Sequence, residues 1–351
     1  MRELHDLIFQ GFQERAENEK LTDDELNTLI DEELPGLLAD FSNDIASEML
    51  KRAPKQLKDL RKRERRFERR NYRRWAAGFD RLQLLIEISM DIGSLTKDDI
   101  GDAFQSSKAQ ALISLHARSL IVSRECLALM KAGFADGALG RWRTLHEIAT
   151  VATFLSEHDD ELSERYLVHR DVLSARAMKS YVAHQERANL TPISDHDLSD
   201  AIDRKDKILQ HYGKEMDSEW GWAYPIIQRK RPKFSDLEEY CDLDHWRPRY
   251  KWASEDTHGQ FRPPQVLLAS VERQSEVILA GASNSGMVDP CQMVAITTRL
   301  SAASLLSLSD SLDFVAMIEV MGIISDQIGP LMMRDEKETL EKARNKQRKR
   351  K

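Results

Sequence analysis

Residues 109–131 read AQALISLHARSLIVSRECLALMK, the most regular stretch of the chain. The stretch contains no Gly or Pro, and its apolar residues recur every three or four positions, the pattern of an α-helix. Gly133 follows it as a helix-ending residue. Residues 138–156 and 159–187 show the same kind of pattern, and the links between them are short. We therefore expect three neighbouring antiparallel helices.

The rest of the chain extends the same fold class. Its 15 Gly and 10 Pro among 351 residues are too few for a turn-rich β fold, and no stretch alternates polar and apolar residues for long. The sequence predicts an all-α protein, a multi-helix bundle with a charged helical extension before it and a basic tail after it. We expect the boundaries 1–75, 76–330 and 331–351.

Three further expectations concern individual helices. Pro35-Gly36 should break the first helical region, and Pro54 should interrupt the helix that follows it. Residues 263–282 should form one long core helix, and residues 290–327 should form another. The charged tail from Arg334 onward should fray.

Charge is strongly segregated along the N-terminal part of the chain. Residues 1–50 carry fourteen acids against three bases, and residues 51–75 carry thirteen bases against three acids, which gives local net charges of −11 and +10. The overall net charge of −7 conceals both blocks. The basic block can bind phosphates, with Tyr72 and Trp75 available to stack on bases. Alternatively, it pairs with the acidic block, within one subunit or between two.

Cysteine usage and apolar segments indicate a cytoplasmic protein. The three cysteines are scattered and form no C-x-x-C pair, so neither a disulfide framework nor a zinc site is predicted. The N-terminus has no apolar segment of the kind found in secretory signals. The apolar residues 300–324 are interrupted by three acids, which favours a buried core helix over a membrane span.

The most informative polar residues lie in the stretch Arg141-Trp142-Arg143-Thr144-Leu145-His146-Glu147. On a helix, Arg143, His146 and Glu147 share a face. A cation, an imidazole and a carboxylate placed together can hold and protonate a phosphate. The plain alternative is an ordinary surface ion pair between Arg143 and Glu147.

Further polar pairs follow along the chain. Tyr166 and His169 stand three residues apart, and Ser254 and His258 stand four apart in a section rich in aromatic residues. Together, the Arg-x-Leu-x-Glu-like, Tyr-x-x-His and Ser-x-x-x-His-Gly motifs resemble a family of uncharacterised bacterial helical domains, over about residues 73–283. The resemblance implies one polar pocket formed by these residues: Arg143, Glu147, Tyr166, His169, Ser254 and His258.

A looser resemblance suggests a reaction. Arg141 and His146 have the Arg-x4-His spacing of HEPN-type ribonucleases, although Trp142 stands where a polar residue commonly follows the Arg. Those helical proteins cut RNA without a metal at a site shared by two subunits, often in anti-phage defence. The resemblance implies that Arg stabilises the charged phosphorane while His moves the proton of the 2′-hydroxyl. An offset of five residues, however, places the two side chains about 140° apart on a helix.

From these observations we expect an RNA-directed, metal-independent effector in bacterial defence or growth arrest, a homo-oligomer with a possible partner protein and no cofactor. The expected catalytic residues are Arg141, Arg143, His146, Glu147, His169 and His258. Tyr166, Ser254, Arg69, Arg70, Arg73 and Arg74 are expected to bind the substrate. A metal site made of His146, Glu147, His169 and His258 is a lesser alternative, because no H-E-x-x-H pair is present. The main alternative is a non-enzymatic helical protein that recognises an anionic ligand or a protein partner.

Overall fold

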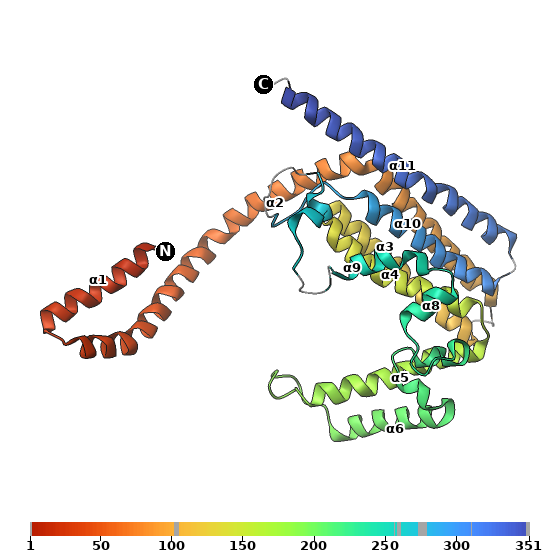
Figure 1. The fold of residues 1–351 in the computed structure, drawn as a ribbon, viewed down its shortest axis with the longest axis horizontal. Helices are drawn as coiled ribbons and strands as arrows, with labels where there is room; N and C mark the ends of the chain where they lie inside the picture. Colours follow the sequence, from red (N-terminus) through yellow and green to blue (C-terminus); the bar gives the residue numbers. More distant parts are fainter. Residues whose placement is uncertain are drawn as a thin grey trace. The chain divides into compact units, whose positions relative to one another are not determined.

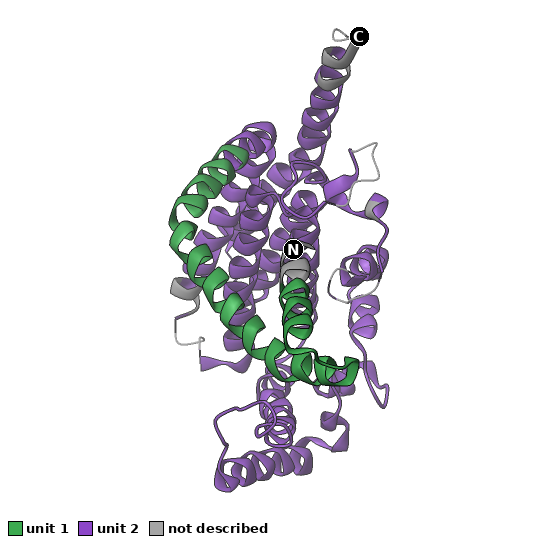
Figure 2. Cartoon of the chain, turned by 90° about the vertical axis from the view of Figure 1, so that its left-hand side faces the viewer, with its two compact units in different colours: residues 1–67 green, residues 68–351 purple. Residues whose placement is uncertain are grey.

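The computed structural model describes residues 2–101, 105–255, 257, 261–272, 279–309 and 311–348. Within these ranges the chain forms eleven α-helices and several short 3-10 turns, and no residue lies in a strand. The all-α fold predicted from the sequence is confirmed. The chain divides into two compact units, residues 1–67 and residues 68–351 (Figure 2). The first unit thus ends inside the basic block, because Asn71 and Trp75 are already buried in the second unit.

The first unit is a helical hairpin. Helix α1 (Arg2–Glu19) is followed by Lys20, whose positive φ of 52° turns the chain, and then by α2 (Asp23–Ile100). Thr22 and Glu25 cap the new helix, because the Glu25 carboxylate accepts hydrogen bonds from the backbone and hydroxyl of Thr22 at 2.9 Å. This is a capping box. An ion pair of 2.8 Å between Arg15 and Glu33 fastens α1 along the first turns of α2.

Helix α2 continues without a break across Pro35, Gly36 and Pro54. The expected breaks at these residues were wrong. A proline inside a helix removes only one backbone hydrogen bond and bends the helix, and the neighbouring turns of α2 preserve its helical path. Residues 68–100 of the same helix belong to the second unit, where one face is buried in the core.

The core of the second unit is made by α3 (Ser107–Ala132), α4 (Ala135–Ser156) and α10 (Val288–Ala303), which lie against one another (Figure 1). Ser106 caps α3 by accepting a hydrogen bond from the Ala109 backbone at 3.1 Å. Gly133 ends it in the left-handed conformation, with φ of 94°. The three expected central helices are therefore present, with α5 (Asp160–Val182) as the third.

Shorter elements surround this core. Helix α6 (Asp195–Tyr212) lies against α5, and α7 (Tyr224–Ile227), α8 (Phe234–Tyr240) and α9 (Arg247–Glu255) follow in the aromatic section. The expected helix over 263–282 was wrong for its described residues, since Pro264–Val266 and Leu268–Ser270 are single 3-10 turns.

The second long helix expected near the C-terminus is divided in two. Helix α10 gives way to a 3-10 turn at Ser304–Leu308, and α11 then runs over Leu312–Arg348. The described part of the expected frayed tail is thus helical. The segments Val288–Leu308 and Leu312–Lys342 are long and apolar enough to cross a membrane by length and composition alone, a test that core helices also pass. The cytoplasmic location remains a prediction.

Candidate functional sites

A buried ionic group links α4 to the aromatic section. His146 Nε2 donates a hydrogen bond of 2.8 Å to Glu238 Oε1, and the second carboxylate oxygen of Glu238 forms an ion pair with Arg247. The side chains of His146 and Glu238 are 2% and 0% exposed. Because buried charges are tolerated only when they are paired and hydrogen-bonded, this group fixes α8 and α9 against α4.

Aromatic rings enclose His146 on the remaining sides. Its imidazole stacks on Trp142 with the ring centroids 5.2 Å apart, and it meets the Phe234 ring edge-on with the centroids 5.8 Å apart. Tyr250 is a third neighbour at 5.9 Å. These contacts leave His146 no access to a substrate on the surface, so the structure gives it a role in positioning the helices around it.

A second polar cluster lies beside this group and reaches the surface. Arg143 Nη2 is 3.2 Å from Glu147 Oε1, and the Tyr250 hydroxyl donates a hydrogen bond to the same carboxylate oxygen. The Arg143 guanidinium also lies 4.9 Å from the centre of the Tyr250 ring. Arg143 and Glu147 are 31% and 30% exposed. We call Arg143, Glu147 and Tyr250 the α4–α9 cluster.

The environment sets the charge of this cluster. Burial raises the pKa of the Tyr250 phenol, and its hydrogen bond to Glu147 raises it further. Burial lowers the pKa of Arg143, but contacts with Tyr250 and Glu147 outweigh that effect and leave it raised. The buried Arg143 Nε finds no acceptor among the residues that the structure describes. At neutral pH the cluster therefore combines a fixed cation with a protonated phenol, and the phenol donates its hydrogen bond to Glu147.

Other expected site residues have different surroundings. Arg141 pairs with Glu125 of α3 and lies 3.4 Å from the Thr144 hydroxyl. Arg141 is part-exposed and pairs with Glu125, whereas His146 is buried and pairs with Glu238. Ser254 shares α9 with Tyr250 and donates a hydrogen bond of 2.7 Å to the Tyr250 carbonyl. His258 lies outside the described residues.

Tyr166 and His169 belong to α5 and contact a different segment. His169 is buried and donates a hydrogen bond of 2.9 Å to the Ser218 carbonyl. Burial is the main reason why the pKa of His169 is lowered, so the ring is neutral at pH 7. Tyr166 contacts the Trp222 ring at 5.1 Å, and burial raises its pKa. The contacts recorded for these two residues thus serve the packing of α5.

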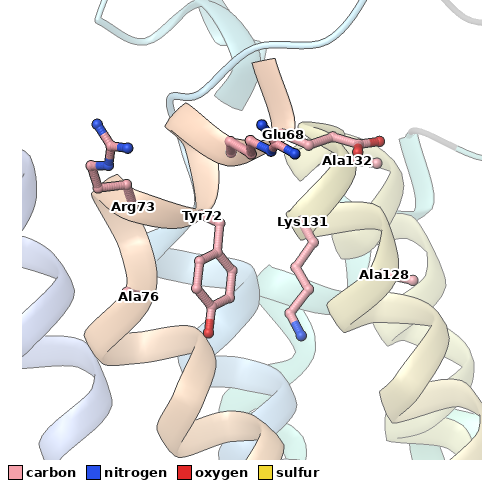
Figure 3. A pocket seen from close by; sticks show the side chains of 8 residues that line it. Glu68, Tyr72, Arg73, Ala76, Ala128, Lys131 and Ala132 are labelled. Carbon is pink, nitrogen blue, oxygen red and sulfur yellow. The ribbon is translucent and has the colours of Figure 1, made fainter. Parts of the chain in front are cut away.

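The basic block contributes to a groove between α2 and α3 (Figure 3). Its volume is about 810 Å³. Arg69, Tyr72 and Arg73 project from α2, and Lys131 projects from the end of α3. Three small residues and one acid complete the lining: Ala76, Ala128, Ala132 and Glu68. We call this feature the α2–α3 groove.

Buried and local contacts hold the groove in place. The Asn71 amide donates hydrogen bonds of 2.8 and 2.9 Å to the Met130 and Lys131 carbonyls, which joins α2 to the last turn of α3. Lys131 Nζ lies 5.7 Å from the centre of the Tyr72 ring. Tyr72 is 39% exposed, and its hydroxyl donates to Asp80, the largest cause of its raised pKa.

Neighbouring basic residues differ from those of the groove. Arg70 is exposed, whereas the Arg74 side chain is only 6% exposed and forms an ion pair of 2.6 Å with Glu272. Its guanidinium also lies 4.4 Å from the centre of the Trp75 ring. Trp75 is fully buried, so its expected stacking on bases is wrong. Arg74 has a structural role here, and Tyr72 is the aromatic side chain that faces the groove.

Sequence reasoning missed Glu238, Arg247, Tyr250 and Lys131 as site residues. Glu238 is one of several acids in a short polar stretch, and nothing local distinguishes it. Arg247 and Tyr250 stand three residues apart, a spacing that places them on one helix face and that could have suggested a shared contact. Within the described ranges, no three His, Cys, Asp or Glu side chains form a group with metal-binding geometry.

Comparison with known proteins gives a match to one family model over part of the chain. Residues 109–273 match a family of unknown function, DUF5677. The matched range begins in α3 and includes α4 to α9, and with them the α4–α9 cluster and Lys131, but it leaves out α2. The sequence-based resemblance to an uncharacterised family is thus supported over this range. No curated protein and no solved structure gives a significant match to the chain.

Proposed function

We propose that this chain is an RNA-directed helical protein that binds single-stranded RNA in the α2–α3 groove. One observation carries the proposal: Arg69, Arg73 and Lys131 line the same groove as the exposed ring of Tyr72, and Lys131 Nζ lies 5.7 Å from the ring centre. Proteins that bind single strands combine such a basic groove with an aromatic platform, since cations hold the phosphates while bases stack on the ring.

The surroundings of the groove favour a polymer over a small anion. The groove residues Arg69, Tyr72 and Arg73 belong to a stretch of sequence, residues 51–75, that carries a net charge of +10. Arg70, on the same turn as Arg69, is exposed to solvent as well. Such a row of cations gains affinity from a chain of phosphates, because each contact releases a condensed counterion.

Fluorescence anisotropy with a labelled single-stranded RNA in EDTA tests this proposal. The double variant with Arg69→Ser and Arg73→Ser should weaken binding about tenfold or more at 0.1 M salt. The slope of log affinity against log salt concentration should become shallower by the amount expected from the loss of about two phosphate contacts. Arg124→Ser is the matched control, because Arg124 is an exposed arginine of α3 paired with Glu87 at 3.1 Å, outside the groove. Equal affinity of the double variant and the control contradicts the proposal.

A second candidate function, metal-independent RNA cleavage, is favoured by the α4–α9 cluster. Arg143, Glu147 and Tyr250 touch one another, and Arg143 and Glu147 reach the surface beside the buried Tyr250 ring. In the proposed step, Glu147 takes the proton of a 2′-hydroxyl, and the oxygen of that hydroxyl forms a bond to phosphorus. Arg143 stabilises the phosphorane, and Tyr250 protonates the departing 5′-oxygen. The products are a 2′,3′-cyclic phosphate and a 5′-hydroxyl, and Glu147 returns its proton to Tyr250.

This candidate keeps the expected chemistry but moves its centre from Arg141 and His146 to the cluster. Cleavage of cellular RNA would arrest growth, which is the route by which we propose a role in bacterial defence. Incubation of the purified chain with RNA in EDTA separates the two functions. Fragments ending in a cyclic phosphate support cleavage, whereas binding without fragments leaves a non-enzymatic RNA-binding protein.

A further inference from the structure

The first unit carries an apolar stripe on α2 that is separate from both sites described above. Its members are three or four residues apart, with an average close to the helical period of 3.6, so they lie along one face of the helix. They are Leu38, Phe41, Ile45, Met49, Ala53, Leu57 and Leu60.

The stripe is exposed within its own unit. Its six large side chains are between 38% and 65% exposed, with Phe41 at the lower limit and Met49 at the upper. Helix α1 packs on an earlier part of α2, where Arg15 pairs with Glu33 and Phe12 is buried. Contiguous exposed apolar surface of this kind marks an interaction site.

The order of the stripe identifies its partner. The intervals between successive members, counted in residues, are the same from either end of the stripe, and Met49 is the midpoint. A second copy of α2, laid antiparallel about a two-fold axis at Met49, therefore places every apolar residue opposite another apolar residue. Leu38 meets the partner subunit's Leu60, and Phe41 meets the partner subunit's Leu57.

Charge along α2 favours the same arrangement. The axis at Met49 sets the acidic stretch before residue 49 of one copy alongside the basic stretch after residue 49 of the other. A parallel, in-register pair would instead set the acidic block, with its net charge of −11, against its own copy. Complementary charge selects orientation because juxtaposed like charges cost several kcal/mol.

We infer that the chain forms an antiparallel homodimer through residues 32–66 of α2, with the two-fold axis at Met49. Two copies of one surface related by a two-fold axis form the commonest kind of protein oligomer. The dimer brings the acidic block of one subunit to the basic block of the other. The inference does not depend on RNA binding and is tested without RNA.

Disulfide cross-linking of the full chain reports the orientation. Under mild oxidation, Met49→Cys should give a covalent dimer, because the axis brings residue 49 of both copies together. Leu38→Cys alone should not, since its two copies lie about 33 Å apart along the helices at 1.5 Å per residue. A mixture of Leu38→Cys and Leu60→Cys chains should cross-link. The unsubstituted chain is the control, because Cys126 and Cys291 are buried and Cys241 is half-buried.

Sedimentation velocity gives an independent measurement on chains without new cysteines. The unsubstituted chain should sediment as a dimer, and Met49→Lys should raise its dissociation constant about fivefold or more, because the axis sets the two lysines together. Asp40→Lys is the control and should leave the dimer unchanged, because residue 40 is nine positions from residue 49 and so lies on the opposite side of the helix. A monomeric unsubstituted chain overturns the inference, as does cross-linking of Leu38→Cys with itself.

Discussion

The imidazole of His146 lies 2.8 Å from the carboxylate of Glu238, a residue 92 positions further along the chain, and both side chains are almost completely buried. Arg247 neutralises the other oxygen of the same carboxylate. The histidine that the sequence suggested as a catalyst therefore lies inside the protein. It holds α8 and α9 in place, and those helices support Tyr250 and the α4–α9 cluster.

We expect His146→Ala to lower the free energy of unfolding by about 2–4 kcal/mol, because it leaves the buried Glu238 oxygen without its donor and opens a cavity beside Trp142. Urea denaturation followed by circular dichroism measures the loss. His184→Ala is the control, since His184 is exposed and should change stability by about 0.5 kcal/mol or less. Equal stabilities of the two variants would show that the buried contact is not formed in solution.

Stability should fall as the pH is lowered from about 7. Burial lowers the pKa of His116 and of His169 in the folded state. Above the unfolded value of about 6.5 both states are neutral, and below it the unfolded state binds protons more readily than the folded state. His169→Gln keeps a hydrogen-bond donor for the Ser218 carbonyl and removes the titration. The slope of unfolding free energy against pH between 5 and 7 should become shallower in this variant; an unchanged slope contradicts the account.

The cleavage proposal distinguishes two nearby arginines. Glu147→Gln should reduce cleavage about 100-fold or more, because it removes the proton acceptor, and it should leave RNA affinity unchanged. Arg143→Ala should cause a comparable loss, whereas Arg141→Ala should have little effect because its partner is Glu125 on α3. Initial rates with a labelled RNA in EDTA measure all three variants. A greater loss for Arg141→Ala than for Arg143→Ala would contradict this site and would favour the Arg-x4-His pair as the catalytic residues.

The sequence predicts the central helices well because their signals are local. Ser106 and Gly133 mark the two ends of α3, and the apolar spacing between them needs no knowledge of the rest of the chain. Helix α2 was harder to predict, since Pro35 and Pro54 are local signals for breaks. The length of the helix on both sides of each proline outweighs those signals.

Each polar site combines residues that are close in the sequence with residues that are far away in it. Local patterns identify only the close residues. Arg143 and Glu147 could be paired from their spacing, but Tyr250 joins them from 103 positions away. Arg70 and Arg74 look equivalent in the sequence, yet only Arg74 is buried against Glu272. Periodicity alone does not identify such partners, because a pairing of helices far apart in the chain leaves no local trace.

The most direct test of the central claim locates the RNA on the protein. Single-stranded RNA containing 4-thiouridine is cross-linked to the full chain by light, and the attached peptides are identified by mass spectrometry. We expect cross-links on the peptides that contain Tyr72 and Lys131, with their yield lost in the chain that carries both Arg69→Ser and Arg73→Ser. Cross-links confined to other surfaces, or the same yield from both chains, would contradict RNA binding in the α2–α3 groove.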